Sequence, residues 1–542
     1  MQHNKIEQLK NLFAKFSIDA YLVPSGDEFL SEYTPNYLNR LLWLTEFESS
    51  NALALITKNE NYIFTDGRYL EAAEKKFGED YIIKDLFQES IWDFIDAKQI
   101  IVGLAPELFT KNDKMRNIKF VPELVDFIWQ RNKFNSSAEY FYYDEQYSGA
   151  SFAQKAAKIC HKMSELGADY LVITQPDMIC WLTNLRGQDQ EYTPLMLAYA
   201  ILAKDGQIEI FLYNEEAKKP DIKGIEYKNF SSFTHRIKEL KLIMLDPNGV
   251  SLALLNIAGE YALLAPNPII EYRAIKSQIE IENAKKIHLI DSIAMTKFLQ
   301  IDFTGLTEEK VKEISYKLRS QSNLFISPSF ETIAGFRGNG SVIHYHVRED
   351  TNQTIEGDGL LLIDSGGQYL GGTTDVTRTI AIGTPTDEQI FAYTTVLRAH
   401  LRLSNAKFKK GTIGKELDQL TRSVLLEQNM NYEHGTGHGV GNFLSVHETP
   451  PSINSRSSAQ MKAGMIISNE PGYYKKGEFG IRIENLCLVV EIDEHTLAME
   501  NLTYVPYDEK LIDYNLLSHE EKKWLADYNE KIQSMLNKDS LS

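Results

Sequence analysis

Two aspartates in the segment 360–382, LLLIDSGGQYLGGTTDVTRTIAI, have the spacing of a metal site. An apolar run ends at Asp364, and a segment rich in β-branched residues follows Asp375, so the pattern predicts two strands joined by a glycine-rich turn. If this hairpin closes between Gln368 and Gly372, the two aspartates lie opposite each other, with Cβ atoms about 5 Å apart. Two like charges at that distance repel unless a cation lies between them, which predicts a metal ion.

Three later stretches carry further residues of the metal-ligand type. They are HGTGHGVG (434–441), SNEPG (468–472) and GIRIEN (480–485). Glycine at alternate positions around His438 argues against a helix and predicts a loop that approaches another group closely. Proline and glycine directly after Glu470 predict that a strand ends there. Period-two alternation places Arg482 and Glu484 on one face of a strand, and a carboxylate on an apolar face needs a partner.

Each of these signals alone is also typical of an ordinary turn, but one domain contains all of them. Four carboxylates and one imidazole form a hard donor set, which favours Mn²⁺, with Co²⁺, Fe²⁺ or Zn²⁺ in competition. Four carboxylates also balance the charge of two divalent cations. Two metals about 3.5 Å apart generate a bridging hydroxide and polarise a carbonyl, which is the chemistry of amide hydrolysis.

Composition excludes several other classes of function. The 542 residues are too many for one core and predict about three domains. The net charge of −18 argues against nucleic acid or an anionic membrane as a partner. Three cysteines without CxxC spacing indicate a reducing compartment. With no apolar run of about 18 residues and no signal-peptide pattern, we expect a cytoplasmic protein.

The phrases AYLV and WLT (20–23 and 43–45) return as DYLV and WLT (169–172 and 181–183) in the same order. This repetition predicts a duplicated α/β domain. A polar linker near 132–137 and a boundary near 273–277 divide the chain into domains 1–135, 136–276 and 277–542.

Four helices are expected, of which the first is amphipathic and the last is charged. They cover residues 6–16, 151–166, 284–298 and 518–536. Ser518 and Glu521 have the spacing of a capping box at the start of the last one.

The order Asp364, Asp375, His438, Glu470, Glu484 resembles the ligand set of the pita-bread metallopeptidases of family M24. Within that family the chain is most similar to the three-domain, cytosolic-type Xaa-Pro aminopeptidases (aminopeptidase P). The motifs that carry the resemblance are VPSGD (23–27), TDGRY (65–69), NLRG (184–187), HY (344–345), DSGGQYLGGTTDVTRT (364–379), HGTGHGVG (434–441), VHE (446–448), NEPGYY (469–474) and FGIRIEN (479–485). The implied fold is mixed α/β (α+β), with two similar creatinase-N-like domains before a pita-bread catalytic domain and its C-terminal helical tail.

The resemblance implies a role for each metal ligand. Asp364 would chelate one metal, and Asp375 and Glu484 would bridge both. His438 and Glu470 would complete the other metal site, and Glu470 would also take the proton of the attacking water.

The resemblance also implies roles for side chains around the metals. His344 and His447 would hold the scissile carbonyl and the developing oxyanion, and His434 would line the pocket for the proline ring. Arg482 would orient Asp364. Arg68 either reaches the active site of a neighbouring subunit or packs within its own domain. We expect His346 to be a solvent-exposed strand residue outside the site.

The resemblance therefore implies a manganese-dependent, homodimeric aminopeptidase that acts on peptides with proline in the second position. The alternative is a prolidase, which cuts dipeptides only. Methionine aminopeptidase needs no double N-terminal extension, and creatinase chemistry needs no metal. A non-catalytic peptide-binding relative would have lost the ligands that this chain keeps.

Overall fold

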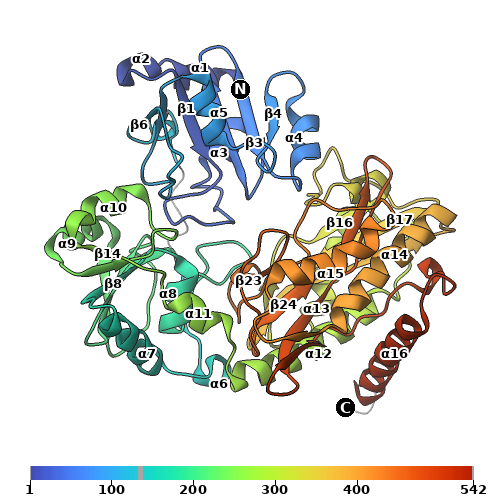
Figure 1. The fold of residues 1–542 in the computed structure, drawn as a ribbon. Coiled ribbons are helices and arrows are strands. Elements are labelled where there is room, and N and C mark those ends of the chain that lie inside the picture. Colours follow the sequence, from blue (N-terminus) through green and yellow to red (C-terminus); the bar gives the residue numbers. More distant parts are fainter. Residues whose placement is uncertain (1, 132–137, 540–542) are drawn as a thin grey trace. The chain divides into compact units, whose positions relative to one another are not determined.

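The computed structural model describes residues 2–131 and 138–539 of the chain (Figure 1). The linker expected near 132–137 lies outside these described residues. The chain folds into two compact units, residues 1–143 with 150–269 and residues 144–149 with 270–542. Within the described ranges, no helix has the length and apolar character that crossing a bilayer requires.

The first unit contains two six-stranded sheets of the same topology. The first sheet has the strand order β4-β3-β2-β1-β5-β6, and the second has the order β12-β11-β10-β8-β13-β14. If the strands of each sheet are numbered from one to six along the chain, both orders read 4-3-2-1-5-6. The parallel and antiparallel pairings also correspond, strand by strand. The predicted duplication is therefore confirmed.

The strands of these two sheets are short. Those of the first are β1 (Ala20–Pro24), β2 (Ala52–Thr57), β3 (Asn61–Thr65), β4 (Ile82–Asp85), β5 (Val102–Leu104) and β6 (Ile118–Phe120). Those of the second are β8 (Tyr170–Ile173), β10 (Ala198–Ala203), β11 (Ile208–Leu212), β12 (Ile225–Asn229), β13 (Ile243–Leu245) and β14 (Ala262–Leu264). A two-stranded ladder joins β7 (Phe141–Tyr142) to β9 (Leu185–Arg186).

Helices accompany both sheets of the first unit. They are α1 (Gln2–Lys10), α2 (Phe13–Phe16), α3 (Arg40–Thr45), α4 (Leu70–Phe77), α5 (Ile91–Lys98), α7 (Phe152–Glu165), α8 (Pro176–Thr183), α9 (Phe233–Glu239) and α10 (Leu252–Ala258), with 3₁₀ turns η1 (Val125–Phe127), η2 (Phe230–Ser232) and η3 (Gly259–Tyr261). The single helix expected over 6–16 is wrong. It divides because the Leu12 N–H bonds to Leu9 O, three residues back, and this tighter turn ends α1.

The second unit holds the motifs from which the sequence predicts a metal site. Its helices are α6 (Glu145–Ser148), α11 (Ile269–Ala274), α12 (Gln278–Phe298), α13 (Glu308–Arg319), α14 (Asp387–Ser404), α15 (Gly414–Leu426) and α16 (His519–Asp539), with η4 (Arg337–Ser341) and η5 (Glu509–Leu511). Ser277 caps α12 in a capping box with Glu280. One apolar cluster joins α14, α15 and α16 to the strand segment 479–483, and another joins α12 and α13 to the segments 334–336 and 361–363.

The strands of this unit form several sheets. The orders are β15-β18-β19, β16-β17-β20, β21-β28-β27-β24-β22-β23 and β25-β26. The bounds are β15 (Phe325–Pro328), β16 (Ile333–Phe336), β17 (Gly359–Ser365), β18 (Gly367–Tyr369), β19 (Gly372–Thr373), β20 (Val376–Ile382), β21 (Lys407–Lys409), β22 (Gly437–Gly439), β23 (Glu448–Ile453), β24 (Ile466–Asn469), β25 (Gly472–Lys475), β26 (Phe479–Arg482), β27 (Asn485–Glu491) and β28 (Thr496–Asn501).

The hairpin of 359–382 forms with a register different from the one expected. Tyr369 pairs with Gly372 across a two-residue turn, and this register places Thr377, rather than Asp375, opposite Asp364. The turn itself requires glycine, because Gly371 has φ +120°. Asp375 lies two residues before Thr377 and is the diagonal neighbour of Asp364 on the same face. The prediction of direct opposition is wrong, but both aspartates still share one face.

The segment 480–490 is likewise not one continuous strand. β26 pairs with β25, whereas β27 belongs to the six-stranded sheet. The break falls at Glu484, whose N–H donates to Thr377 O (3.1 Å) and whose carbonyl accepts from Arg378 Nη1 (2.7 Å). These bonds to β20 replace the ladder bonds that a continuous strand would make.

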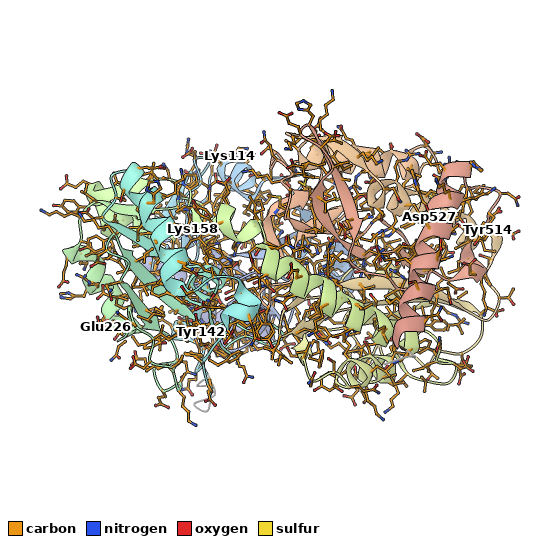
Figure 2. The ribbon with its side chains drawn as sticks, turned by 90° about the horizontal axis from the view of Figure 1, so that it is seen from below. Lys114, Tyr142, Lys158, Glu226, Tyr514 and Asp527 are labelled. Carbon is orange, nitrogen blue, oxygen red and sulfur yellow. The ribbon has the colours of Figure 1, made fainter. Side chains whose placement is uncertain are left out.

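The terminal helix α16 starts as predicted. Ser518 N–H donates to Glu521 Oε2 (2.7 Å) and Glu521 N–H donates to Ser518 Oγ (3.1 Å), which forms the capping box. The outer face of the helix is exposed, as at Asp527 (Figure 2). On the inner face, the Tyr528 hydroxyl accepts from Val505 N (3.0 Å) and Arg378 Nη2 (3.1 Å) and donates to Val505 O (2.9 Å).

We predict that Tyr528→Phe lowers the free energy of unfolding by about 1–3 kcal/mol, because it leaves buried donors without their acceptor. Urea denaturation followed by circular dichroism measures the change. The matched control is Tyr514→Phe, at an exposed tyrosine that donates to Glu509 and is labelled in Figure 2; it should change stability by less than about 0.5 kcal/mol. Equal effects of the two substitutions would contradict this account of α16.

Candidate metal centre

Five side chains of the second unit converge from separate elements. Asp364 is the next-to-last residue of β17, Asp375 precedes β20, His438 lies within β22, Glu470 follows β24, and Glu484 lies between β26 and β27. Each stands at or next to a strand end, where the backbone leaves the ladder and the side chain can turn towards the common centre.

The distances define a compact cluster. His438 Nε2 lies 3.5 Å from Asp375 Oδ2 and 3.4 Å from Glu470 Oε1. Asp375, His438 and Glu484 each offer a ligand atom within 4.8 Å of the others. His438 Nδ1 donates to Gly439 O (2.9 Å), so Nε2 is the nitrogen that faces the carboxylates.

The strand that carries His438 requires its glycines. A Cβ at Gly437 would lie 2.0 Å from Ser468 O, and a Cβ at Gly439 would lie 2.3 Å from Glu448 O. Both contacts are with backbone atoms, which cannot move aside as a side chain could. Glycine therefore allows β22 to lie between β23 and β24 with His438 directed at the carboxylates.

Burial of so many acids raises their pKa values. Burial raises the pKa of Asp364 to about 6, although the Arg482 charge lowers it, and the neighbouring Asp375 raises it further. Burial together with the charges of Asp375, Glu470 and Asp364 holds the pKa of Glu484 well above its usual value. For His438, burial alone would lower the pKa, but the contacts with Asp375 and Glu470 outweigh it and raise the pKa to about 9.

The donor set fits divalent cations. Asp364 Oδ1, Asp375 Oδ1 and Glu484 Oε1 are buried and have no hydrogen-bond partner in the described part of the chain. A buried carboxylate oxygen without a partner is costly, and a cation would satisfy all three. The combination of four carboxylates with one imidazole suits hard or borderline metals.

A second layer of hydrogen bonds holds the carboxylates. The predicted contact between Arg482 and Asp364 is present, with Nη2 to Oδ2 at 2.6 Å. Thr377 Oγ accepts from Arg482 Nε (3.2 Å) and donates to Glu484 Oε2 (2.7 Å), so it links the two sides of the cluster. Sequence reasoning did not single out Thr377, although its place opposite Asp364 follows once the hairpin register is known.

His434 is connected to the same arginine through Tyr474. The Tyr474 hydroxyl accepts from Arg482 Nη1 (2.7 Å) and donates to His434 Nε2 (2.8 Å). The His434 ring also packs beside those of Tyr432 and Tyr474, with centroids 4.8 and 5.5 Å away. Tyr474 lies in the NEPGYY motif but was not predicted as a site residue.

Of the other two histidines proposed for the substrate, His447 lies beside His438, and His344 follows a residue that contacts Arg482. The His447 ring is 4.2 Å from the His438 ring, between centroids. His344 is half-buried and follows Ile343, whose carbonyl accepts from Arg482 Nη1 (3.4 Å).

Two other residues named from the sequence form ion pairs with nearby carboxylates. His346 is neither in a strand nor fully exposed; it is half-buried because Nδ1 pairs with Glu331 Oε2 at 2.7 Å, which corrects the expectation. Arg68 binds Asp66 of its own domain through Nε (2.9 Å) and Nη2 (2.7 Å).

Comparisons with known proteins decide the family. The description "Metallopeptidase family M24" matches residues 282–491, and its C-terminal region matches 495–539. Two "Creatinase/Prolidase N-terminal domain" descriptions match 5–118 and 131–280. A probable Xaa-Pro aminopeptidase P from Laccaria bicolor is 34% identical over 99% of this chain and 91% of its own length. The chain belongs to the Xaa-Pro aminopeptidase family of M24 metallopeptidases.

Other Xaa-Pro aminopeptidases also match this chain over nearly its full length. Xaa-Pro aminopeptidase 1 of Dictyostelium discoideum is 35% identical over 97% of this chain and 92% of its own. The X-prolyl aminopeptidase of Caenorhabditis elegans, described as a cytosolic enzyme with a di-nuclear active site, has a TM-score of 0.94 and 28% identity over 99% of this chain and 96% of its own. A prolidase from Pyrococcus furiosus matches 64% of this chain and 99% of its own, with a TM-score of 0.52 and 26% identity.

The raised pKa values give the metal-free protein a defined pH dependence. The folded state keeps protons that the unfolded chain releases, on Asp364 between pH 3.8 and about 6 and on His438 between 6.5 and about 9. Stability falls with pH wherever the folded state binds more protons. We therefore expect the thermal midpoint in a chelator to decrease from pH 5 to pH 9 at constant ionic strength.

Two controls separate this effect from the general charge of the protein. His438→Gln should flatten the decrease above pH 6.5, and added Mn²⁺ should raise the midpoint more at pH 8 than at pH 5. A midpoint that rises with pH in the chelator would contradict the electrostatic description of the cluster.

Proposed function

We propose that the protein is a metal-dependent aminopeptidase that hydrolyses the bond between an N-terminal residue and a following proline. The observation that carries the proposal is the convergence of four carboxylates and His438 around buried, unpartnered oxygens. Family membership over the full chain supports it. The fold is a mixed α/β architecture of two creatinase-like domains and a catalytic domain.

The cluster would hold two divalent cations, with Mn²⁺ preferred and Co²⁺, Zn²⁺ or Fe²⁺ as competitors. Asp364 would be a ligand of one cation, His438 and Glu470 would be ligands of the other, and Asp375 and Glu484 would be shared by both. When bound, the pair supplies an activated water and polarises the scissile carbonyl.

The protein's own groups handle the proton and the developing charge. Glu470, partly exposed at the edge of the cluster, accepts the proton of the attacking water. His344 and His447 bind the scissile carbonyl and stabilise the oxyanion that forms from it. Each hydrogen bond to that oxygen strengthens as negative charge builds, which lowers the barrier rather than the energy of the bound substrate.

Selectivity for proline comes from the pocket at His434. The bond to Tyr474 fixes the imidazole, and the rings of Tyr432 and Tyr474 pack against it. Such a pocket suits the compact pyrrolidine ring. Because the nitrogen of an Xaa-Pro bond has no hydrogen to donate, the ring rather than an N–H group must locate the substrate.

Prolidase is the second candidate, since prolidase structures share the catalytic fold. The extra N-terminal domain favours the aminopeptidase, because the Pyrococcus furiosus prolidase matches only 64% of this chain while covering 99% of its own. We further propose the division into domains 1–135, 136–276 and 277–542, a homodimer, and a cytoplasmic location. Nucleic acid and membranes are not expected partners at a net charge of −18.

The purified protein with Mn²⁺ should release free arginine from the tripeptide Arg-Pro-Pro and should also cut longer peptides with proline second. Amino-acid analysis of the products measures this. Cleavage of dipeptides alone would identify a prolidase, and absence of release with every divalent metal tested would refute the proposal.

Substitution of a bridging carboxylate should remove metal and activity together. Asp375→Ala and Glu484→Ala each take away a ligand that both cations share, so metal analysis should show the loss of at least one ion per chain and nearly all turnover. The matched control is Glu331→Ala, an acid of the same unit that pairs with His346; it should retain two ions. Two ions retained by Asp375→Ala or Glu484→Ala would refute the ligand assignment.

A further inference from the structure

A buried lysine stands directly before the long helix α12. Lys276 precedes the helix cap Ser277, and its side chain is 1% exposed. Its N–H donates to Gly464 O (2.9 Å), and its ammonium donates to Arg273 O (2.8 Å) and to Glu448 Oε1 (2.5 Å). The lysine is therefore fixed at both its backbone and its side chain, and its charge is directed at one carboxylate.

Glu448 is the first residue of β23 and follows His447. It pairs with Gly439, the residue after His438, in the ladder between β22 and β23. Its side chain is 2% exposed, and the segment that carries Lys276 holds the next residue as well, through Arg273 Nη2 to Thr449 O (3.3 Å). The ion pair thus fixes the point where the strand of His438 meets the chain of His447.

The placement of His447 depends on this point. Its ring lies 4.2 Å from that of His438, so a small rotation of the backbone at 447–448 would move it off the position from which it binds a carbonyl. The two strands lie very close together at Gly439. A Cβ built at this glycine would be only 2.3 Å from Glu448 O. Without Lys276, the buried Glu448 carboxylate would keep the longer ion pair from Arg273 Nε to Oε2 (4.0 Å), so it would shift towards that guanidinium.

We propose that Lys276 is a positioning residue, which acts through Glu448 to hold His447 in place for the oxyanion. This inference rests on the proposed aminopeptidase function and assigns a catalytic purpose to an ion pair that lies outside the metal cluster. Because the effect is on the transition state, loss of the ion pair should lower kcat more than it changes KM.

The test uses the full-length protein loaded with Mn²⁺ and the substrate Arg-Pro-Pro. Lys276→Met should lower kcat at least ten-fold, with KM changed less than three-fold and metal content unchanged. Lys276→Arg, which restores a cation, should recover most of the loss. The matched control is Lys155→Met, at a buried lysine of the first unit that donates to Asn184 Oδ1 (2.6 Å) and Trp181 O (2.8 Å); it should keep the kcat of the unsubstituted protein.

A double-mutant cycle distinguishes positioning from general support of the fold. In a His447→Gln background, Lys276→Met should reduce the remaining kcat less than two-fold, because the group it positions is already gone. A full ten-fold loss in that background would mean that Lys276 acts through the fold, and an unchanged kcat in Lys276→Met alone would also overturn the inference.

The experiment distinguishes failure of the proposed function from failure of the positioning role. If Lys276→Met does not fold, Glu448→Gln keeps the side-chain volume and removes the same charge pair, and it is then expected to show the same kcat loss and the same cycle. If the unsubstituted protein does not cleave Arg-Pro-Pro, the proposed function fails; if it cleaves while every variant of the pair is fully active, only the positioning role fails.

Discussion

The mutual repulsion of four carboxylates in a largely buried site is the constraint on which the catalytic unit depends. Asp364, Asp375 and Glu484 are each less than a tenth exposed, and each has an oxygen that the described protein leaves unpartnered. Such a group of charges is tolerated only with protons or cations among them. In the metal-free protein, the raised pKa values of Asp364 and Glu484 mean that protons neutralise part of this negative charge. Bound divalent ions would neutralise it while the carboxylates stay ionised.

The surrounding architecture keeps these charges close while it satisfies their outward-facing atoms. Arg482 binds Asp364 from behind, and Thr377 connects Arg482 with Glu484. Glycines allow the strand of His438 to lie against its neighbours at distances that a Cβ would prevent. In physical terms the fold fixes the ligands before any cation arrives, which reduces the reorganisation that binding requires.

Patterns local in the sequence predicted much of this site. The strand ends at Asp364 and Glu470 and the non-helical loop of His438 follow from apolar runs, glycine and proline. The same patterns did not predict the register of the hairpin. A shift of two residues in the pairing changes the residue opposite Asp364 but leaves Asp364 on the same face of the sheet. The break at Glu484 was missed because its backbone bonds to β20, a segment about 100 residues away. Lys276 and Thr377 were not singled out for the same reason, because their partners Glu448 and Glu484 are distant in sequence.

A continuous chain of hydrogen bonds runs from His434 through Tyr474 and Arg482 to Asp364. Under the proposed function, this chain would couple substrate recognition to the metal cluster. A substitution at Tyr474 that removed its hydroxyl would take a hydrogen bond from the guanidinium that holds Asp364. Under the proposed function, a change at Tyr474 would therefore alter selectivity and rate together. Broadened substrate choice would arise more readily from residues that line the pocket without belonging to this chain of bonds.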